Sequence, residues 1–241
     1  MRIYACADYR AMSRRAASLI AAQVLLKPDC VLGLATGSTP VGLYRQLAEW
    51  HQQGDLSFAG VRSVNLDEYL GLAPDHEQSY RRFMQVNLFD HIDIRPEHTH
   101  VLNGLAPDPQ AECAAYDQLI RKLGGVDLQL LGMGHNGHIA FNEPGDDFGL
   151  ETHVVRLSER TIDANQRFFA SRDEVPRQAL TLTMSQILAI PHAIAVVPTA
   201  RKARAVADAL RGPVCERCPA SALRRHTDAR LYLDADSASL L

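Results

Sequence analysis

Short apolar runs that recur along the chain constrain the fold of this sequence more than any other feature. Runs such as Val31–Ala35 and Ile194–Val197 are apolar throughout, and amphipathic segments with helical spacing, such as Met12–Leu26, lie between them. Strands that are apolar on both faces are typical of a parallel sheet covered by helices on both sides. The sequence therefore predicts an α/β fold built on a mostly parallel sheet with helices on both faces.

The same pattern predicts one Rossmann-like domain over residues 1–241. The expected strands are Arg2–Ala5, Val31–Ala35, Val61–Leu66, Asp127–Leu131, His153–Leu157, Leu180–Thr183, Ile194–Val197 and Arg230–Leu233. The expected helices are Met12–Leu26, Val41–His51, Ser79–Phe89, Gln110–Leu123 and Ala200–Leu210.

Composition excludes several classes of protein. A hydrophobic content of 46% in 241 residues can supply the core of one domain. The net charge of −3 shows no basic excess, so we expect no nucleic-acid partner. No apolar run reaches the roughly 18 residues of a membrane span, and the charged N-terminal stretch MRIYACADYR lacks the apolar segment of a signal peptide. We expect a cytoplasmic protein without a membrane contact.

Cysteine and histidine spacing does not predict a metal site. The five cysteines are scattered, which argues against a disulfide framework. Cys215-x-x-Cys218 supplies half of a tetrahedral zinc site, and no second pair completes it. His135-x-x-His138 lacks a third ligand and the helical context of a His-Glu-x-x-His motif. We expect reduced thiols and no metal.

Polar segments follow four of the expected strands. VLGLA is followed by TGSTP, VRSVNL by DEYLG, DLQLL by GMGHNGHIAFNEPG, and AIAVV by PTARK. Ligands of open α/β sheets bind beyond the carboxyl ends of the strands. A small-residue turn, two carboxylates, a His/Glu loop and an Arg/Lys pair would suit a phosphorylated small molecule.

The segment from Thr36 to Pro40 is a candidate anion site. Gly37 lets the backbone approach a ligand closely, Ser38 and Thr39 are good helix caps, and the helix that follows directs its amides and dipole at the turn. No Gly-Lys-Ser/Thr follows, so this is not a Walker motif. An ordinary helix cap is the alternative interpretation.

The carboxylates and histidines form the second candidate group. Asp67 and Glu68 point opposite ways in an extended chain, so one can face a cleft as a general base; a pair of turn residues is the alternative. His138, followed by Glu143, fits an imidazole oriented by a carboxylate. Arg167 and Lys202 could close over a phosphate, although each alone is commonly a surface cation.

The literal G-x-G-x-x-G at Gly132, Gly134 and Gly137 does not predict a dinucleotide site. In a dinucleotide fold the third glycine begins a long helix, whereas Asn142, Pro144 and Gly145 break any helix here. No acidic residue ends a second strand about 20 residues later, as ribose binding requires. The glycines are better explained by a tight loop around a small substrate.

Together these segments resemble the glucosamine-6-phosphate deaminase family, in its shorter non-allosteric branch. The matching pieces are LGLATGSTP, NLDEYLGL, SYRRFM, GMGHNGHIAFNEPG, ANQRFF and the lysine of TARK, in family order across nearly the whole chain. The resemblance implies isomerising deamination of glucosamine 6-phosphate to fructose 6-phosphate and ammonia, in amino-sugar catabolism. It implies an aldose–ketose isomerase and hydrolase that needs no cofactor.

The resemblance also implies roles for individual residues. Phosphate would be held by Thr36, Gly37, Ser38 and Thr39 with Arg167 and Lys202. His138 would move the proton that opens the sugar ring, with Glu143 orienting it, and Asp67 would carry a proton from C2 to C1. Many family members have Asp where this chain has Asn136, which we interpret as a positioning residue.

The shorter branch implies a monomer or small homo-oligomer and not an allosteric hexamer. The chain lacks the longer tail of hexameric members, and the segment after Glu143 is acidic where allosteric members are basic. A related family on the same fold, the 6-phosphogluconolactonases, typically has DER and GHTASLFP where this chain has DEY and GHIAFNEP. A non-catalytic sugar-phosphate sensor on this fold is the third possibility. Glucosamine and galactosamine 6-phosphate are not distinguished by the sequence.

Overall fold

The computed structural model describes residues 1–145 and 147–241, and its centre is a parallel sheet. The strand order is β1-β10-β9-β6-β2-β3-β5, and every neighbouring pair in this seven-stranded sheet runs parallel. The strands are β1 (Arg2–Ala5), β2 (Val31–Leu34), β3 (Arg62–Asn65), β5 (Thr99–His100), β6 (Leu128–Gly132), β9 (His192–Val197) and β10 (Ala229–Leu233). The predicted α/β class and mostly parallel sheet are confirmed.

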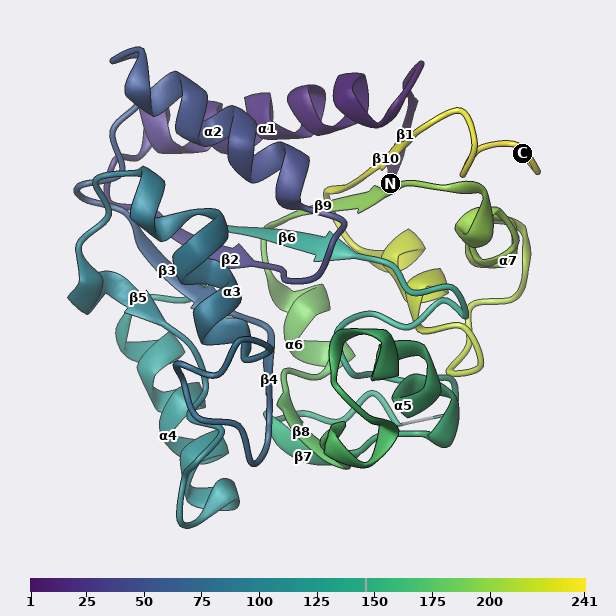
Figure 1. Ribbon diagram of the computed structural model, residues 1–241. Helices are drawn as coiled ribbons and strands as arrows, with labels where there is room; N and C mark the ends of the chain where they lie inside the picture. The colour runs from purple at the N-terminus through teal and green to yellow at the C-terminus, as the bar shows by residue number, and fades with distance from the viewer. Residues whose placement is uncertain (146) are drawn as a thin grey trace.

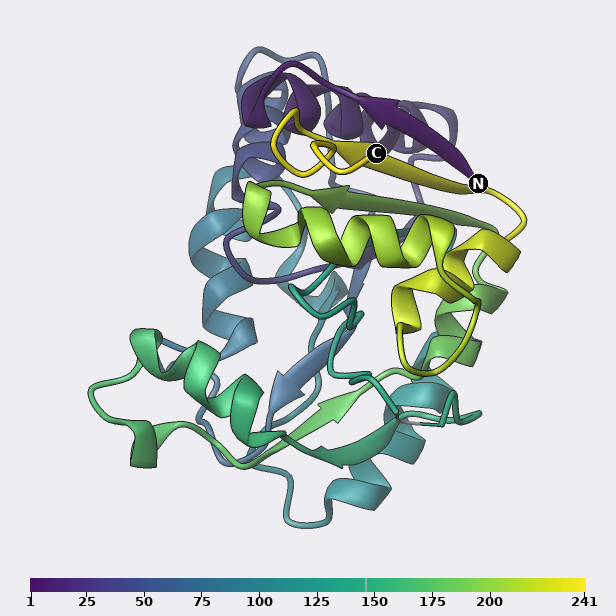
Figure 2. The same cartoon turned by 90° about the vertical axis from the view of Figure 1, so that its right-hand side faces the viewer.

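Helices cover both faces of this sheet, as predicted. α1 (Tyr9–Leu26) and α2 (Val41–Gln52) lie side by side on one face, and α7 (Ala203–Arg211) lies on the other (Figures 1 and 2). The remaining helices are α3 (Tyr80–Asn87), α4 (Pro109–Lys122), α5 (Glu159–Asn165) and α6 (Met184–Ala189). None of the helices in the described ranges is long and apolar enough to cross a membrane.

Helix α1 shows how the sequence produces this packing. The Asp8 side chain accepts a hydrogen bond from the Ala11 amide at 2.7 Å and so caps the first turn. Met12, Ala16 and Ile20 recur every four residues, and all three are fully buried. One face of the helix is therefore apolar and packs on the sheet, while the other meets solvent.

The chain reverses its direction of travel across the sheet between β2 and β6. From β2 the chain moves to β3, and from β6 it moves to β9 on the opposite side. Right-handed crossovers then put α2 and α7 on opposite faces. The two loops that leave the neighbouring strands β2 and β6 diverge here, which makes this the place where an open α/β sheet binds ligands.

A second sheet was not predicted as such. β4 (Asp67–Tyr69), β8 (Gln178–Thr181) and β7 (His153–Arg156) form a three-stranded antiparallel sheet below the main one (Figure 1). The Leu182 amide donates to the Leu66 carbonyl at 2.8 Å and ties the second sheet to the end of β3. β4 is short and polar, so its sequence carries no strand pattern; its pairing with β8 decides its conformation.

Two expected boundaries were wrong for local reasons. The expected strand over Leu180–Thr183 ends at Thr181, because the Thr183 hydroxyl accepts from the Gln186 amide and caps α6. The expected helix over Ala200–Leu210 begins instead with a 3₁₀ turn, Ala200–Lys202, and α7 follows. This turn places Lys202 at the cavity described next.

Candidate active site

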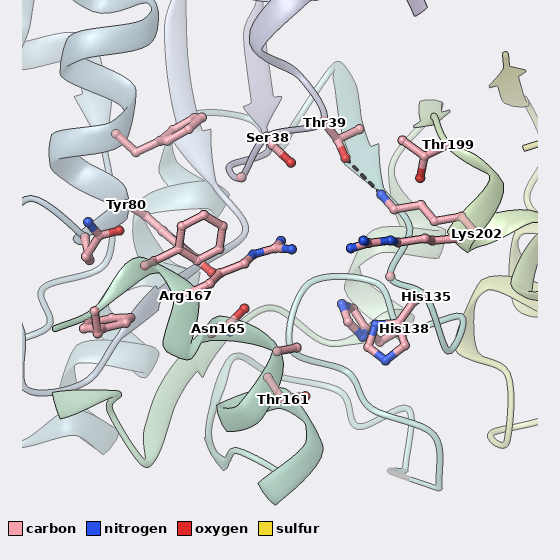
Figure 3. Close-up of a pocket in the computed structure, with 18 of the residues that line it drawn as sticks. Ser38, Thr39, Tyr80, His135, His138, Thr161, Asn165, Arg167, Thr199 and Lys202 are labelled. Atoms are coloured by element: carbon pink, nitrogen blue, oxygen red, sulfur yellow. Dashed lines mark hydrogen bonds between the residues drawn. The ribbon is translucent and has the colours of Figure 1, made fainter. Parts of the chain in front are cut away.

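A cavity of about 1140 Å³ lies beyond the carboxyl ends of the central strands. It is lined by the loops that follow β2, β6 and β9, by the start of α3, and by α5 and the turn after it (Figure 3). The lining residues used below are Gly37, Ser38, Thr39, Tyr69, Gly134, His138, Thr161, Arg167, Thr199 and Lys202.

The turn after β2 is open toward this cavity. Gly37 has φ +83°, and a Cβ there would meet nothing within 4 Å. Pro40 is the N-cap of α2, and no side chain caps the helix. The expected capping by Ser38 or Thr39 is therefore wrong, because the Thr39 hydroxyl instead accepts from Lys202 Nζ at 3.0 Å. Thr36 is partly exposed and lies outside the residues that line the cavity.

Tyr9 of α1 fixes the shape of this turn. Its hydroxyl donates to the Thr39 carbonyl at 2.9 Å and accepts from the Gly42 amide, in the first turn of α2, at 2.8 Å. The Tyr9 hydroxyl thus accepts from the Gly42 amide, one of the amides at a helix N-terminus that have no partner within the helix. No local sequence pattern identifies Tyr9 in this role, because it lies 30 residues before Thr39.

Arg167, Arg201 and Lys202 are the arginine and lysine side chains that line the cavity. Arg167 and Lys202 point toward each other from opposite sides of the cavity, with Ser38 and Thr39 above them (Figure 3). Burial lowers the pKa of Lys202 to about 8; Asp234 raises it and Arg167 lowers it further. Two converging cations, one of them largely desolvated, make a strong site for an anion.

Asp67 is a buried carboxylate on the cavity side of β4. Glu68 points into the protein, where its carboxylate accepts from the amides of Tyr80 and Arg81 at 2.9 and 3.0 Å. Alternation along the strand directs Asp67 to the same side as Tyr69, which lines the cavity, although Asp67 itself lies outside the lining residues. In the described part of the chain, no group forms a hydrogen bond with the Asp67 carboxylate. Burial, helped by the negative charge of Glu68, raises the pKa of Asp67 to about 8.

Asn136 links His138 to Glu143. The Asn136 side-chain oxygen lies 2.7 Å from His138 Nδ1, and its amide nitrogen donates to Glu143 Oε2 at 2.8 Å. The direct distance from His138 Nδ1 to Glu143 Oε1 is 3.6 Å. Glu143 was expected to orient the imidazole of His138. In the structure the Asn136 side-chain amide lies between the two and hydrogen-bonds with both.

This arrangement fixes the tautomer of a neutral His138. An ionised carboxylate only accepts, so the Asn136 amide nitrogen must face Glu143 and its oxygen must face the histidine. Nδ1 then carries the proton, and Nε2 becomes the basic nitrogen. The Thr161 hydroxyl of α5 also donates to Glu143 Oε1, so α5 touches the same carboxylate.

The glycines of the loop make room for the imidazole. A Cβ on Gly134 would lie 2.1 Å from His138 Cε1, and a Cβ on Gly137, which has φ +85°, would lie 2.8 Å from Cys218 Sγ. The backbone of this loop therefore passes close to the side chains of His138 and Cys218, while its contact with a substrate stays a prediction. Cys215 and Cys218 are free thiols, and among the described residues no group of three or more His, Cys, Asp or Glu could hold a metal ion.

Comparison with known proteins gives the family. Residues 7–233 match the family described as glucosamine-6-phosphate isomerases/6-phosphogluconolactonase. The chain belongs to this family. A glucosamine-6-phosphate deaminase of Lachnoclostridium phytofermentans is 53% identical over 228 residues, which cover 95% of this chain and 97% of the relative. One from Halothermothrix orenii is 48% identical over 241 residues and covers both chains completely.

Solved structures of the family share the fold. A monomeric glucosamine-6-phosphate deaminase matches with a TM-score of 0.97 and 46% identity, over 100% of both chains. A 6-phosphogluconolactonase from Trypanosoma brucei matches with a TM-score of 0.81 over 100% of this chain and 98% of the other. Its identity of 20% shows the shared fold alone.

Gly134→Ala should reduce turnover by about tenfold or more, because the added methyl group displaces the His138 ring and small displacements of reacting groups cost large factors in rate. Gly132→Ala is the matched control, since a Cβ there meets nothing within 4 Å. Steady-state kinetics of both variants would test this. Equal kcat values for the two would show that Gly134 is not needed to seat the imidazole.

Asp67→Asn should stabilise the protein at high pH. The pKa of Asp67 rises from 3.8 to about 8 on folding, so unfolding releases a proton between these values and the native chain loses stability as pH rises through this window. The variant has no such proton. Its advantage in melting temperature should grow from pH 5 to pH 8, as measured by calorimetry, and a constant difference would contradict the raised pKa.

Proposed function

We propose that this chain catalyses the isomerising deamination of glucosamine 6-phosphate to fructose 6-phosphate and ammonia. The observation that carries the proposal is a buried carboxylate with a raised pKa, Asp67, two residues before the cavity-lining Tyr69, together with an anion site and an oriented histidine. The relatives named as glucosamine-6-phosphate deaminases, one of them 53% identical over 95% of this chain, support the same activity.

The phosphate end of the substrate would lie at the turn after β2. Gly37, Ser38 and Thr39 line the cavity there, with Thr36 immediately before them. A dianion would satisfy Arg167 and Lys202 together and would raise the pKa of Lys202 toward its ordinary range. Phosphate binding would thus keep both cations charged and would fix the sugar relative to the loop after β6.

His138 would open the sugar ring. Its Nε2 accepts the proton of the anomeric hydroxyl and returns a proton to the ring oxygen, which breaks the C1–O5 bond and gives the open-chain aldehyde. Asn136 holds the required tautomer, and the negative charge of Glu143 stabilises the imidazolium that forms between the two transfers.

Asp67 would then move the proton that makes the sugar a ketose. The carboxylate removes the proton from C2, and O1 takes up a proton to give the enolamine. The carboxylate then delivers its proton to C1, and the amino group loses a proton as it becomes the C2 imine, so that the net change moves one hydrogen from C2 to C1 and one from nitrogen to O1. The imine at C2 takes up water and releases ammonia, so one glucosamine 6-phosphate and one water give one fructose 6-phosphate and one ammonia. A pKa near the working pH suits a group that must both take and give a proton. We assign His138 and Asp67 to ring opening and isomerisation, and the attack of water on the imine follows these steps.

The deciding experiment is a release assay with a panel of substrates. Ammonia and fructose 6-phosphate should form from glucosamine 6-phosphate, and unphosphorylated glucosamine should react far more slowly. Galactosamine 6-phosphate tests the configuration at C4. Hydrolysis of 6-phosphogluconolactone without ammonia release from any amino sugar phosphate would replace this proposal with the lactonase, and no reaction with either would favour a sensor.

Asp67→Asn should lower kcat by roughly a hundredfold or more, with KM little changed, because the amide keeps the shape and removes the base. Glu68→Gln is an informative comparison, because Glu68 faces α3 and its charge raises the pKa of Asp67. The acidic limb of its pH profile should shift downward. Turnover of Asp67→Asn close to wild type would remove Asp67 from the reaction.

Asn136→Asp should shift the limb of the kcat/KM profile that belongs to His138 to higher pH. The substitution puts a negative charge on an atom 2.7 Å from Nδ1, and this charge favours the imidazolium. A pH series of wild type and variant, with His138→Gln to assign the limb, measures the shift. An unchanged limb would show that the new carboxyl shares a proton with Glu143 and carries no added charge.

The chain should follow a hyperbolic rate law. We propose that it works as a monomer or small homo-oligomer, since the solved relative with 46% identity is described as monomeric and cooperativity needs coupled sites. Rate curves with and without N-acetylglucosamine 6-phosphate, combined with light scattering, would test this. A sigmoidal curve that becomes hyperbolic with the acetylated sugar phosphate would contradict it.

A further inference from the structure

Thr199 adopts a backbone conformation that disfavours its own side chain. Its φ is +79° and its ψ is +143°, and among the described residues only Thr199 and Ala140 have positive φ without being glycine. A β-branched residue at positive φ is strained. Such strain persists only where surrounding groups impose it, and it occurs disproportionately at functional sites.

The group that imposes this conformation is Asp234. Its two carboxylate oxygens accept from the Thr199 amide at 2.9 and 3.1 Å, and only 6% of its surface is exposed. Asp234 directly follows β10, whose last residue pairs with the last residue of β9. The carboxylate thus reaches from the end of one strand to the loop of its neighbour. The Ser237 amide, which donates to Asp234 Oδ1 at 2.8 Å, holds it there.

Thr199 in turn sets the position of Lys202. The Thr199 carbonyl accepts from the Lys202 amide at 3.0 Å and closes the 3₁₀ turn Ala200–Lys202. A change in the Thr199 backbone would rotate this turn and withdraw Lys202 Nζ from the Thr39 hydroxyl. The negative charge of Asp234 also opposes the effect of burial on the lysine.

We propose that Asp234 is a positioning residue of the anion site: it holds Thr199 in a strained conformation that aims Lys202 at the phosphate group. The inference rests on the proposed function for the identity of the substrate, but the anion site itself can be tested with inorganic phosphate. Asp234 acts through Thr199 and lies outside the cavity lining.

Asp234→Ala removes the acceptor and should weaken the binding of inorganic phosphate by about tenfold, measured by calorimetry. KM for glucosamine 6-phosphate should rise by a similar factor, with kcat at saturation close to wild type. Asp236→Ala is the matched control, because Asp236 is an exposed aspartate two residues away. Its phosphate affinity should equal that of the wild type.

A second substitution separates positioning from general damage. Glycine adopts positive φ without strain, so Thr199→Gly added to Asp234→Ala should recover most of the lost phosphate affinity. A protein that is merely destabilised would not be repaired by a glycine. Asp234→Asn keeps one acceptor oxygen and drops the charge. Its phosphate affinity should approach that of wild type at pH 6.5, where Lys202 is protonated, and fall below it at pH 8.5.

The outcomes separate this inference from the proposed function. Wild-type phosphate affinity in Asp234→Ala, or a double variant no better than the single one, would overturn the positioning role even if ammonia release is normal. A phosphate defect that Thr199→Gly repairs would support it even if glucosamine 6-phosphate proved not to be the substrate.

Discussion

Parallel pairing of β9, β6 and β2 is the constraint on which the rest of this structure depends. It brings the carboxyl ends of three strands to one edge, so the loops that follow them must meet. From β2 and β6 the chain continues in opposite directions across the sheet. The turn after β2 and the loop after β6 therefore both line a common cavity. Neither loop needs secondary structure of its own, because the parallel pairing of β2 with β6 fixes the positions at which the two loops begin.

The cavity combines groups that burial perturbs in opposite directions. Desolvation raises the pKa of Asp67 to about 8 and lowers that of Lys202 to about 8, so burial disfavours the charged form of each group. A ligand with an anionic end and an acidic C–H relieves both. In the proposed reaction a phosphate would satisfy the lysine, and the carboxylate would acquire a proton from carbon. The buried ionisable groups thus destabilise the folded protein, and a ligand that relieves this cost would bind more tightly for that reason.

The second sheet has a separate role in this arrangement. Its strand β4 begins one residue after Leu66, and antiparallel pairing with β8 turns Glu68 toward α3 and Asp67 to the opposite side, which it shares with the cavity-lining Tyr69. Helix α5 then contributes Thr161 to the Glu143 carboxylate, and the turn after it contributes Arg167. The proposed catalytic and phosphate-binding ends of the site therefore share α5 and the turn after it, which couples their positions.

Sequence reasoning located most of the candidate site because its residues lie next to strong strand signals. Apolar runs predicted β2, β6 and β9, and the polar residues after them included Ser38, His138 and Lys202. The positions of Asp67 and Glu68 followed from alternation in an extended chain, which β4 confirms. The roles of Tyr9, Thr161 and Asp234 were not predicted, because each acts on a residue at least 18 positions away through a contact without a local pattern.

The sequence by itself thus determined the α/β class, the order of the main elements and the chemical groups available at the strand ends, since periodicity and turn residues act over a few neighbouring positions. Only the tertiary structure decided which of the two adjacent carboxylates points toward α3, that Asn136 lies between His138 and Glu143, and that the Asp234 carboxylate accepts from the amide of the strained Thr199. These features depend on the distance and direction between side chains from different strands and loops, which packing of the whole chain sets and no local pattern encodes.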